Sequence, residues 1–188
     1  MSKTLRIGTR GSALALWQAD HIAARLTEAT GRPTERIIFK TRGDHILDRP
    51  LAEIGGKGLF TKELEVSLAD GEIDLAVHSL KDMPTQLPEG MVLGAIPERG
   101  DVRDCWITRL GEQGATPASI GTASLRRACL AKRRFPDAHI EPIRGNVQPR
   151  TQRVHDAPPR RVDAVILAWA GVSRIGLIER EDVQFTPL

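Results

Sequence analysis

Small or hydroxyl residues and cations occur together in four short stretches, each following a predicted β-strand. Because ligands of open α/β sheets bind beyond the carboxyl ends of the strands, these stretches form the candidate site. Free N–H groups at a helix start and the N–H groups of arginine both bind carboxylates or phosphates. Any one stretch fits ordinary helix capping, but the set predicts a site for small anions. The stretches are Thr9-Arg10-Gly11-Ser12, Ser79-Leu80-Lys81-Asp82, Gly121 to Arg127, and Arg144-Gly145-Asn146.

Asp82 is the acid that stands beside a cation, Lys81, after a predicted strand. Pro84 disfavours helical geometry at Met83, so the backbone after Asp82 should be extended and should turn its carboxylate toward a ligand. One carboxylate among cations suits proton transfer to a leaving group and stabilisation of a developing positive charge. The alternative interpretation is an aspartate in a solvent-exposed turn.

The glycine-rich stretch from Gly55 to Gly58 contains Lys57, but no Ser or Thr follows this lysine as a phosphate-binding loop requires. We interpret the stretch as a flexible loop that presents Lys57 to an anion, with a plain surface turn as the alternative. The five histidines are too scattered for a metal site, so no structural metal is expected.

Charge is concentrated in the second half of the chain. The 188 residues carry 27 Lys and Arg against 24 Asp and Glu, a net charge of +3. Residues 126–174 hold 11 basic and 4 acidic residues, 11 − 4 = +7, which indicates an anionic partner. Stacking on single-stranded nucleic acid needs aromatic side chains, and the chain has four Phe, three Trp and no Tyr. Small anions are therefore favoured over nucleic acid, which would bind with a steep salt dependence, and over a merely solvated basic face.

Compartment is inferred from what the sequence does not contain. No apolar run reaches the roughly 20 residues of a membrane helix, and the N-terminal residues lack the apolar core of a secretion signal. We therefore expect a cytoplasmic protein. Cys105 and Cys129 form no CxxC motif and are expected to be reduced thiols rather than a disulfide.

Strands and helices alternate along the chain, which predicts an α/β fold with parallel sheets. Polar, proline and glycine residues at 97–101 separate two apolar runs and predict a crossing between domains. The predicted strands are residues 5–9, 36–40, 74–78, 91–96, 105–108, 119–122, 139–144 and 163–168, and the predicted helices start near Ser12, Leu59, Ser124 and Asn146.

Six motifs in order resemble the porphobilinogen deaminase family, the hydroxymethylbilane synthases: RIGTRGSALA, GGKGLF, VHSLKDMPT, GTASLRR, IRGNV and DAVILAWAG, between Leu5 and about Gly176. The resemblance implies a transferase that condenses four porphobilinogen molecules into linear hydroxymethylbilane with loss of ammonia, on the route to haem. It also implies two α/β domains like periplasmic binding proteins, with mixed, mainly parallel sheets and a cleft between them. We expect these domains at residues 1–97 and 98–188, the second being basic.

The resemblance further implies roles for single residues. Asp82 matches the catalytic acid that assists loss of ammonia and stabilises the positive pyrrole intermediate. Porphobilinogen carries an acetate and a propionate, so the cations match groups that bind carboxylates. The residues implied to bind the dipyrromethane cofactor are Lys81, Ser124, Arg126, Arg127 and Arg144; those implied to bind substrate are Arg10, Ser12, Lys57, Arg150 and Arg174.

Two departures from the family pattern stand out. Family members continue into a third domain, whose cysteine holds the cofactor by a thioether, and we expect this domain and this anchor to be missing here because the chain stops at Leu188. The family chain also returns to complete its first sheet, so we expect an unfilled strand position and an exposed edge that promotes association of an otherwise monomeric protein. In addition, Pro149 replaces the usual Thr, and residues 157–161 replace a shorter turn, which bears on the role of Arg150.

The alternative function is a non-catalytic module that binds a small polycarboxylate. Asp82 separates the two functions, because a carboxylate among cations weakens anion binding but serves a catalyst of ammonia loss.

Overall fold

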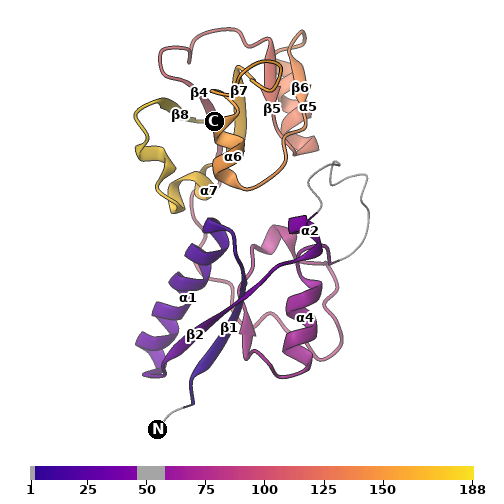
Figure 1. Ribbon diagram of the computed structural model, residues 1–188, viewed down its shortest axis with the longest axis vertical. Coiled ribbons are helices and arrows are strands. Elements are labelled where there is room, and N and C mark those ends of the chain that lie inside the picture. The colour runs from indigo at the N-terminus through magenta and orange to yellow at the C-terminus, as the bar shows by residue number, and fades with distance from the viewer. Residues whose placement is uncertain (1–2, 46–57) are drawn as a thin grey trace. The chain divides into compact units, whose positions relative to one another are not determined.

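The computed structural model describes residues 3–45 and 58–188 (Figure 1). The chain separates into two compact units, each with its own sheet. In the described part, unit 1 comprises residues 3–45 and 58–97, and unit 2 comprises residues 98–188. No helix among these residues is long and apolar enough to cross a membrane.

Unit 1 contains a parallel sheet of three strands in the order β2-β1-β3. The central strand β1 pairs along its whole length with β2, and its middle pairs with the short β3. Arg10 therefore lies at the carboxyl end of the central strand. The elements are β1 (Leu5–Arg10), α1 (Ala13–Thr30), β2 (Thr34–Phe39), α2 (Arg42–His45), α4 (Lys62–Ala69), β3 (Leu75–Ala76) and the 3₁₀ turn η1 (Leu80–Asp82).

Two residues set the limits of α1. The Ser12 hydroxyl accepts a hydrogen bond from the backbone N–H of Ala15 at 3.3 Å, which satisfies one of the free donors of the first turn. Gly31 ends the helix with a φ of 65° and donates its N–H to the carbonyl of Thr27. The predicted start of this helix near Ser12 is confirmed.

Gly8 in β1 lets the strand pack closely against α4 and the loop that follows it. A Cβ atom at this position would lie 2.3 Å from Cδ1 of Ile73 and 3.0 Å from Cδ2 of Leu64, both of which are buried. The position therefore requires glycine for packing rather than for an unusual backbone angle.

Unit 2 contains a mixed sheet of five strands in the order β6-β5-β7-β4-β8. Strand β5 is parallel to β6 and β7, whereas β4 is antiparallel to β7 and β8. The mixed, mainly parallel fold implied by the resemblance is confirmed, and the all-parallel arrangement expected from strand–helix alternation is wrong at β4 and β8. The elements are β4 (Asp104–Arg109), β5 (Ser119–Gly121), α5 (Leu125–Arg134), β6 (His139–Glu141), α6 (Val147–Gln152), β7 (Ala164–Ala168), α7 (Trp169–Arg174), the 3₁₀ turn η2 (Leu177–Glu179) and β8 (Val183–Pro187).

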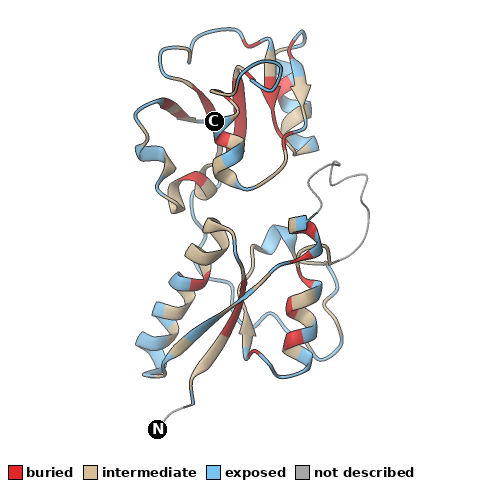
Figure 2. Cartoon of the chain, viewed as in Figure 1, coloured by how far each residue is buried: buried red, intermediate tan, exposed pale blue. Residues whose placement is uncertain are grey.

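Both faces of this sheet are buried (Figure 2). Alternate residues of β7 point to opposite faces, so Val165 and Leu167 pack in one apolar cluster while Ala164 and Ile166 pack in the other. Covering on both faces explains the continuous apolar run that predicted this strand.

The predicted strand at 91–96 is wrong. These residues form no strand, and Val92 is 83% exposed. The run has β-forming residue types, but β propensity expresses packing on a sheet, and no described residue pairs with the run.

Two predicted strands are shorter in the structure. The strand predicted at 74–78 keeps only Leu75–Ala76. The strand predicted at 139–144 ends at Glu141, because Pro142 follows and has no N–H for the ladder. The alternation did not predict β8, α7 or the short α2.

Candidate functional site

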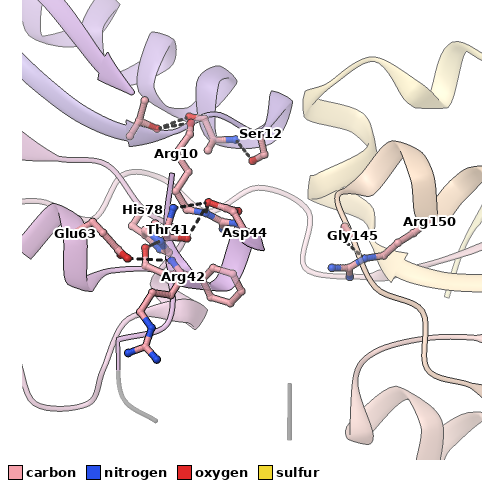
Figure 3. A network of polar contacts seen from close by, with 12 residues as sticks. Arg10, Ser12, Thr41, Arg42, Asp44, Glu63, His78, Gly145 and Arg150 are labelled. Atoms are coloured by element: carbon pink, nitrogen blue, oxygen red, sulfur yellow. Dashed lines mark hydrogen bonds and ion pairs between the residues drawn. The ribbon is translucent and has the colours of Figure 1, made fainter. Parts of the chain in front are cut away.

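Arg10 is held inside unit 1 by Asp44, which lies in α2 (Figure 3). The guanidinium contacts both carboxylate oxygens, with Nε 3.3 Å from Oδ2. Its flat face covers the ring of Phe60, with 4.3 Å between Cζ and the ring centroid. Arg10 is thus fixed in direction before any ligand arrives.

Asp44 is itself held by the turn that precedes it. Its Oδ2 accepts hydrogen bonds from the N–H and the hydroxyl of Thr41, at 3.0 and 2.8 Å. Burial alone would raise the pKa of Asp44, but the hydrogen bonds from Arg10 and Thr41 outweigh it and keep the pKa below its ordinary value. Gly43 is required here, because a Cβ would lie 2.1 Å from the Phe60 ring.

His78 joins two segments of unit 1. Its Nε2 lies 3.1 Å from the carbonyl oxygen of Phe60, and its Nδ1 lies 3.3 Å from that of Ser79. The Ser79 hydroxyl also accepts a hydrogen bond from the side-chain amide of Gln18 at 3.0 Å. Ser79 therefore starts the next turn from a fixed position.

That turn, η1, carries Lys81 and Asp82, and both are exposed. The N–H of Asp82 donates to the carbonyl of Ser79 at 3.0 Å. Met83 has φ −77° and ψ 145°, so the extended backbone predicted before Pro84 is confirmed. The side chain of Asp82 makes no ion pair with any other described residue, which leaves its carboxylate open to solvent.

Ser124 starts α5 in unit 2 and caps it by accepting the N–H of Arg127 at 3.4 Å. Arg126 and Arg127 both reach Asp104, the first residue of β4, at 2.9 Å. Burial would raise the pKa of Asp104, but hydrogen bonds from the two arginines outweigh it and hold the pKa below its usual range. The structure therefore brings three of the predicted residues into one cluster.

Arg144 lies in the turn after β6, and Arg150 lies in α6, which follows that turn. Gly145 has φ 99°, a left-handed conformation that favours glycine, and its carbonyl accepts Nε of Arg150 at 2.6 Å (Figure 3). Pro149 is the third residue of α6, where its missing N–H has no intrahelical partner in any case. Asn146 directly precedes the helix, as predicted, but its side chain makes no capping hydrogen bond.

The remaining predicted residues lie elsewhere. Arg174 ends α7, and its guanidinium packs beside Gly100, where a Cβ would lie 3.2 Å from an Nη atom. Lys57 lies outside the described residues. Among the residues that are described, no group of three His, Cys, Asp or Glu side chains could hold a metal ion.

Sequence reasoning missed Asp44 and Asp104, the two acids that hold the arginines. Both contacts join residues far apart in sequence, 34 positions for Asp44 and 22 or 23 for Asp104. The sequence did offer a signal for each acid, because Asp44 comes shortly after one strand and Asp104 stands at the start of another.

Unit 2 also contains a pocket of about 330 Å³. Its lining includes Trp106, Thr108 and Asp163. Asp163 directly precedes β7, so the pocket lies at the amino end of that strand. The predicted site residues follow carboxyl ends instead, and none of them lines the pocket.

The chain matches the family model described as porphobilinogen deaminase, dipyromethane cofactor binding domain, over residues 5–187. It is 52% identical over 181 residues to a porphobilinogen deaminase of a Nitratiruptor species, covering 93% of this chain and 56% of that protein. It is 48% identical over 185 residues to the enzyme of the same name from Chromobacterium violaceum, covering 96% of this chain and 59% of that protein. The chain thus spans less than two thirds of the length of these relatives.

Among solved structures, the chain is similar to the periplasmic VFT2 domain of Bordetella pertussis BvgS, with a TM-score of 0.52. The likeness covers 98% of this chain and 74% of that chain at 15% sequence identity. At this identity the likeness concerns the fold alone.

Proposed function

The chain belongs to the porphobilinogen deaminase family, and we propose that it takes part in tetrapyrrole synthesis by condensing porphobilinogen into hydroxymethylbilane with loss of ammonia. The observation that carries the proposal is the family match over residues 5–187, which includes every residue singled out from the sequence as a site residue. This chain covers 56% and 59% of the two relatives, so the activity of the whole protein is a proposal for this chain.

The arginines are proposed to bind carboxylates. Each porphobilinogen unit brings an acetate and a propionate, so a growing chain of pyrroles accumulates negative charge. Arg126 and Arg127 present N–H groups in the paired geometry that a carboxylate accepts, each charge-assisted bond contributing about 1.5 to 3 kcal/mol. Arg10, fixed by Asp44, offers the same chemistry in unit 1.

Asp82 is proposed to act on the reacting carbon. Loss of ammonia from an aminomethyl pyrrole leaves a positive charge on the pyrrole, and a nearby carboxylate stabilises that charge. A protonated carboxyl can also donate to the departing amine. The exposure of Asp82 and the extended backbone after it support this role.

The residues present fit the dipyrromethane cofactor of the family, whose own acetate and propionate groups call for the same donors. The guanidinium groups of Arg126 and Arg127 and the hydroxyl of Ser124 lie on one helix turn and supply such donors. When bound, the cofactor supplies the primer to which pyrrole units are added. The side chains of Ser124, Arg126 and Arg127 would hold its carboxylates.

Porphobilinogen consumption by the purified chain tests the proposal, with Asp82→Asn as the variant and Asp20→Asn as a control in the same unit. Asp20 forms an exposed pair with Arg36, so its loss should leave turnover unchanged. We expect turnover in the wild type and the control and at least about a hundredfold loss in Asp82→Asn, in the range of general acid–base catalysis.

Binding without turnover in all three proteins would contradict the proposal and favour the polycarboxylate-binding module. An intact-mass spectrum of each protein shows in addition whether two pyrrole units are attached. Loss of turnover in the control as well would assign the effect to folding.

A further inference from the structure

Arg126 and Arg127 are neighbours in sequence on the first turn of α5. Side chains at adjacent helix positions do not face each other, and two guanidinium groups repel each other. Left to themselves, the two side chains would therefore diverge. In the structure they converge on one carboxylate, that of Asp104.

The contacts of Asp104 involve both of its carboxylate oxygens. Oδ1 of Asp104 lies 3.1 Å from Nη2 of Arg126, and 3.0 and 2.9 Å from Nε and Nη2 of Arg127. Oδ2 lies 2.9 Å from Nη1 of Arg126. The side chains of Asp104 and Arg127 are 15% and 14% exposed, so water screens this pair only weakly, whereas Arg126 is 61% exposed.

Contacts to Asp104 use fewer than half of the donors of the two arginines. A guanidinium has five N–H donors, so the pair has about ten, of which contacts to Asp104 engage about four. Asp104 therefore orients both arginines without exhausting their capacity to bind a further carboxylate.

We propose that Asp104 is a positioning residue. It holds the side chains of Arg126 and Arg127 so that both can bind one ligand that bears several carboxylates. The inference rests on the proposed function in one respect, namely that the two arginines bind carboxylates. It adds that the acid beside them strengthens this binding, although its own charge opposes it.

The charge of Asp104 and its positioning of the arginines have opposite effects on anion affinity, so the direction of the change in affinity distinguishes them. Replacing Asp104 by Asn removes a negative charge next to two cations, and electrostatics alone predicts tighter binding of any anion. Loss of preorganisation predicts weaker binding, and only for a ligand that needs both arginines at once. The two effects therefore differ in direction.

The experiment is calorimetric titration of the purified chain with tricarballylate, which has three carboxylates, and with acetate, which has one. We expect Asp104→Asn to bind tricarballylate about tenfold more weakly, a difference of about 1.4 kcal/mol, and to bind acetate no more weakly than the wild type. Asp104→Glu, which restores the charge at a similar position, should recover part of the affinity.

Asp182→Asn is the matched control. Asp182 also pairs with an arginine of unit 2, Arg180, but it lies next to β8 near the opposite end of β4. This variant should bind both probes as the wild type does. Melting temperatures of all variants reveal any that fail to fold, and a folding defect would weaken both probes together.

Equal or tighter binding of tricarballylate by Asp104→Asn overturns the inference, and so does absence of tricarballylate binding by the wild type. The proposed function is read separately from porphobilinogen turnover. Weaker tricarballylate binding in the variant, without turnover in the wild type, would support the positioning role and contradict the enzymatic one. Turnover in the wild type together with tighter tricarballylate binding in the variant would support the enzymatic function and contradict the positioning role.

Discussion

Asp44 shows how one residue fixes the direction of another in unit 1. Its carboxylate accepts hydrogen bonds from both Arg10 and Thr41, and Phe60 packs against the guanidinium. A long side chain held in this way loses its freedom during folding rather than during binding.

Asp44→Asn should lower the free energy of unfolding at pH 7 by about 1 to 2 kcal/mol, because it removes a charge-assisted contact. The folded pKa of Asp44 lies below its ordinary value, so this stabilisation is present above the ordinary value and is lost as pH falls through the folded pKa. Urea denaturation should therefore show a difference from wild type that shrinks below about pH 4.

The control for Asp44 is Asp20→Asn, which breaks the exposed pair with Arg36. Exposed pairs contribute about 0 to 1 kcal/mol, so the control should change little. A difference for Asp44→Asn that does not depend on pH would contradict the ion-pair explanation.

The two cysteines should differ in reactivity. Both are free, but burial raises the pKa of Cys105 to about 12, whereas Cys129 is exposed on α5. A thiol reagent such as dithionitrobenzoate at pH 8 should label one thiol in the native chain and two in denaturant, because the thiolate is the reactive form. Native Cys129→Ser should not react, and rapid labelling of that variant would show that Cys105 is accessible.

At the scale of elements, the starts of α5 and α6 differ in their caps. The Ser124 hydroxyl accepts the N–H of Arg127, whereas Asn146 makes no side-chain cap. Both residues sit at turns that carry arginines, so each combines the start of a helix with the placement of a cation.

Ser124→Ala should lower the free energy of unfolding by about 1 kcal/mol, and Asn146→Ala by at most a few tenths, because only the first removes a capping bond. Urea or thermal denaturation of the two variants measures the contrast within one unit. Equal losses would mean that the cap contributes nothing beyond the propensity of the residue.

At the scale of the molecule, the outer strand β2 of unit 1 bears on whether copies of the chain associate. In the described residues β2 is an outer strand, and its Ile38 is 56% exposed. An outer strand with an exposed apolar side chain can serve as a template for pairing with another chain.

We expect the wild type to associate as its concentration rises, and Ile38→Lys to reduce this, because a charge on an edge strand opposes pairing. Sedimentation velocity over a hundredfold concentration range checks the result. Leu110→Lys places the same charge on an exposed apolar residue outside any strand and should leave association unchanged. A monomer at every concentration would contradict the expectation.

The sequence predicted those parts of the fold that depend on local pattern. The apolar run of β7 and the caps of α1 and α5 are visible in a few consecutive residues, and the structure confirms them. The turns that follow the strands could be recognised in the same way, because each combines a small or hydroxyl residue with a cation over a few positions.

The rest depends on contacts between distant residues. Strand β8 is short and half polar, and it becomes a strand because β4 pairs with it. The run at 91–96 is mostly apolar and yet forms no strand, since no described residue pairs with it. The two acids that hold the arginines were missed for the same reason, because their role follows from tertiary contact rather than from local pattern.

The central place of β7 has a consequence for how unit 2 opens. The strand is hydrogen-bonded to β5 on one side and β4 on the other, and both its faces are covered. Its amide hydrogens therefore reach solvent deuterium only when the whole sheet comes apart, whereas those of β6 and β8 exchange as the edges fray. The rate of hydrogen–deuterium exchange at the amides of β7 would thus report how often unit 2 unfolds as a whole.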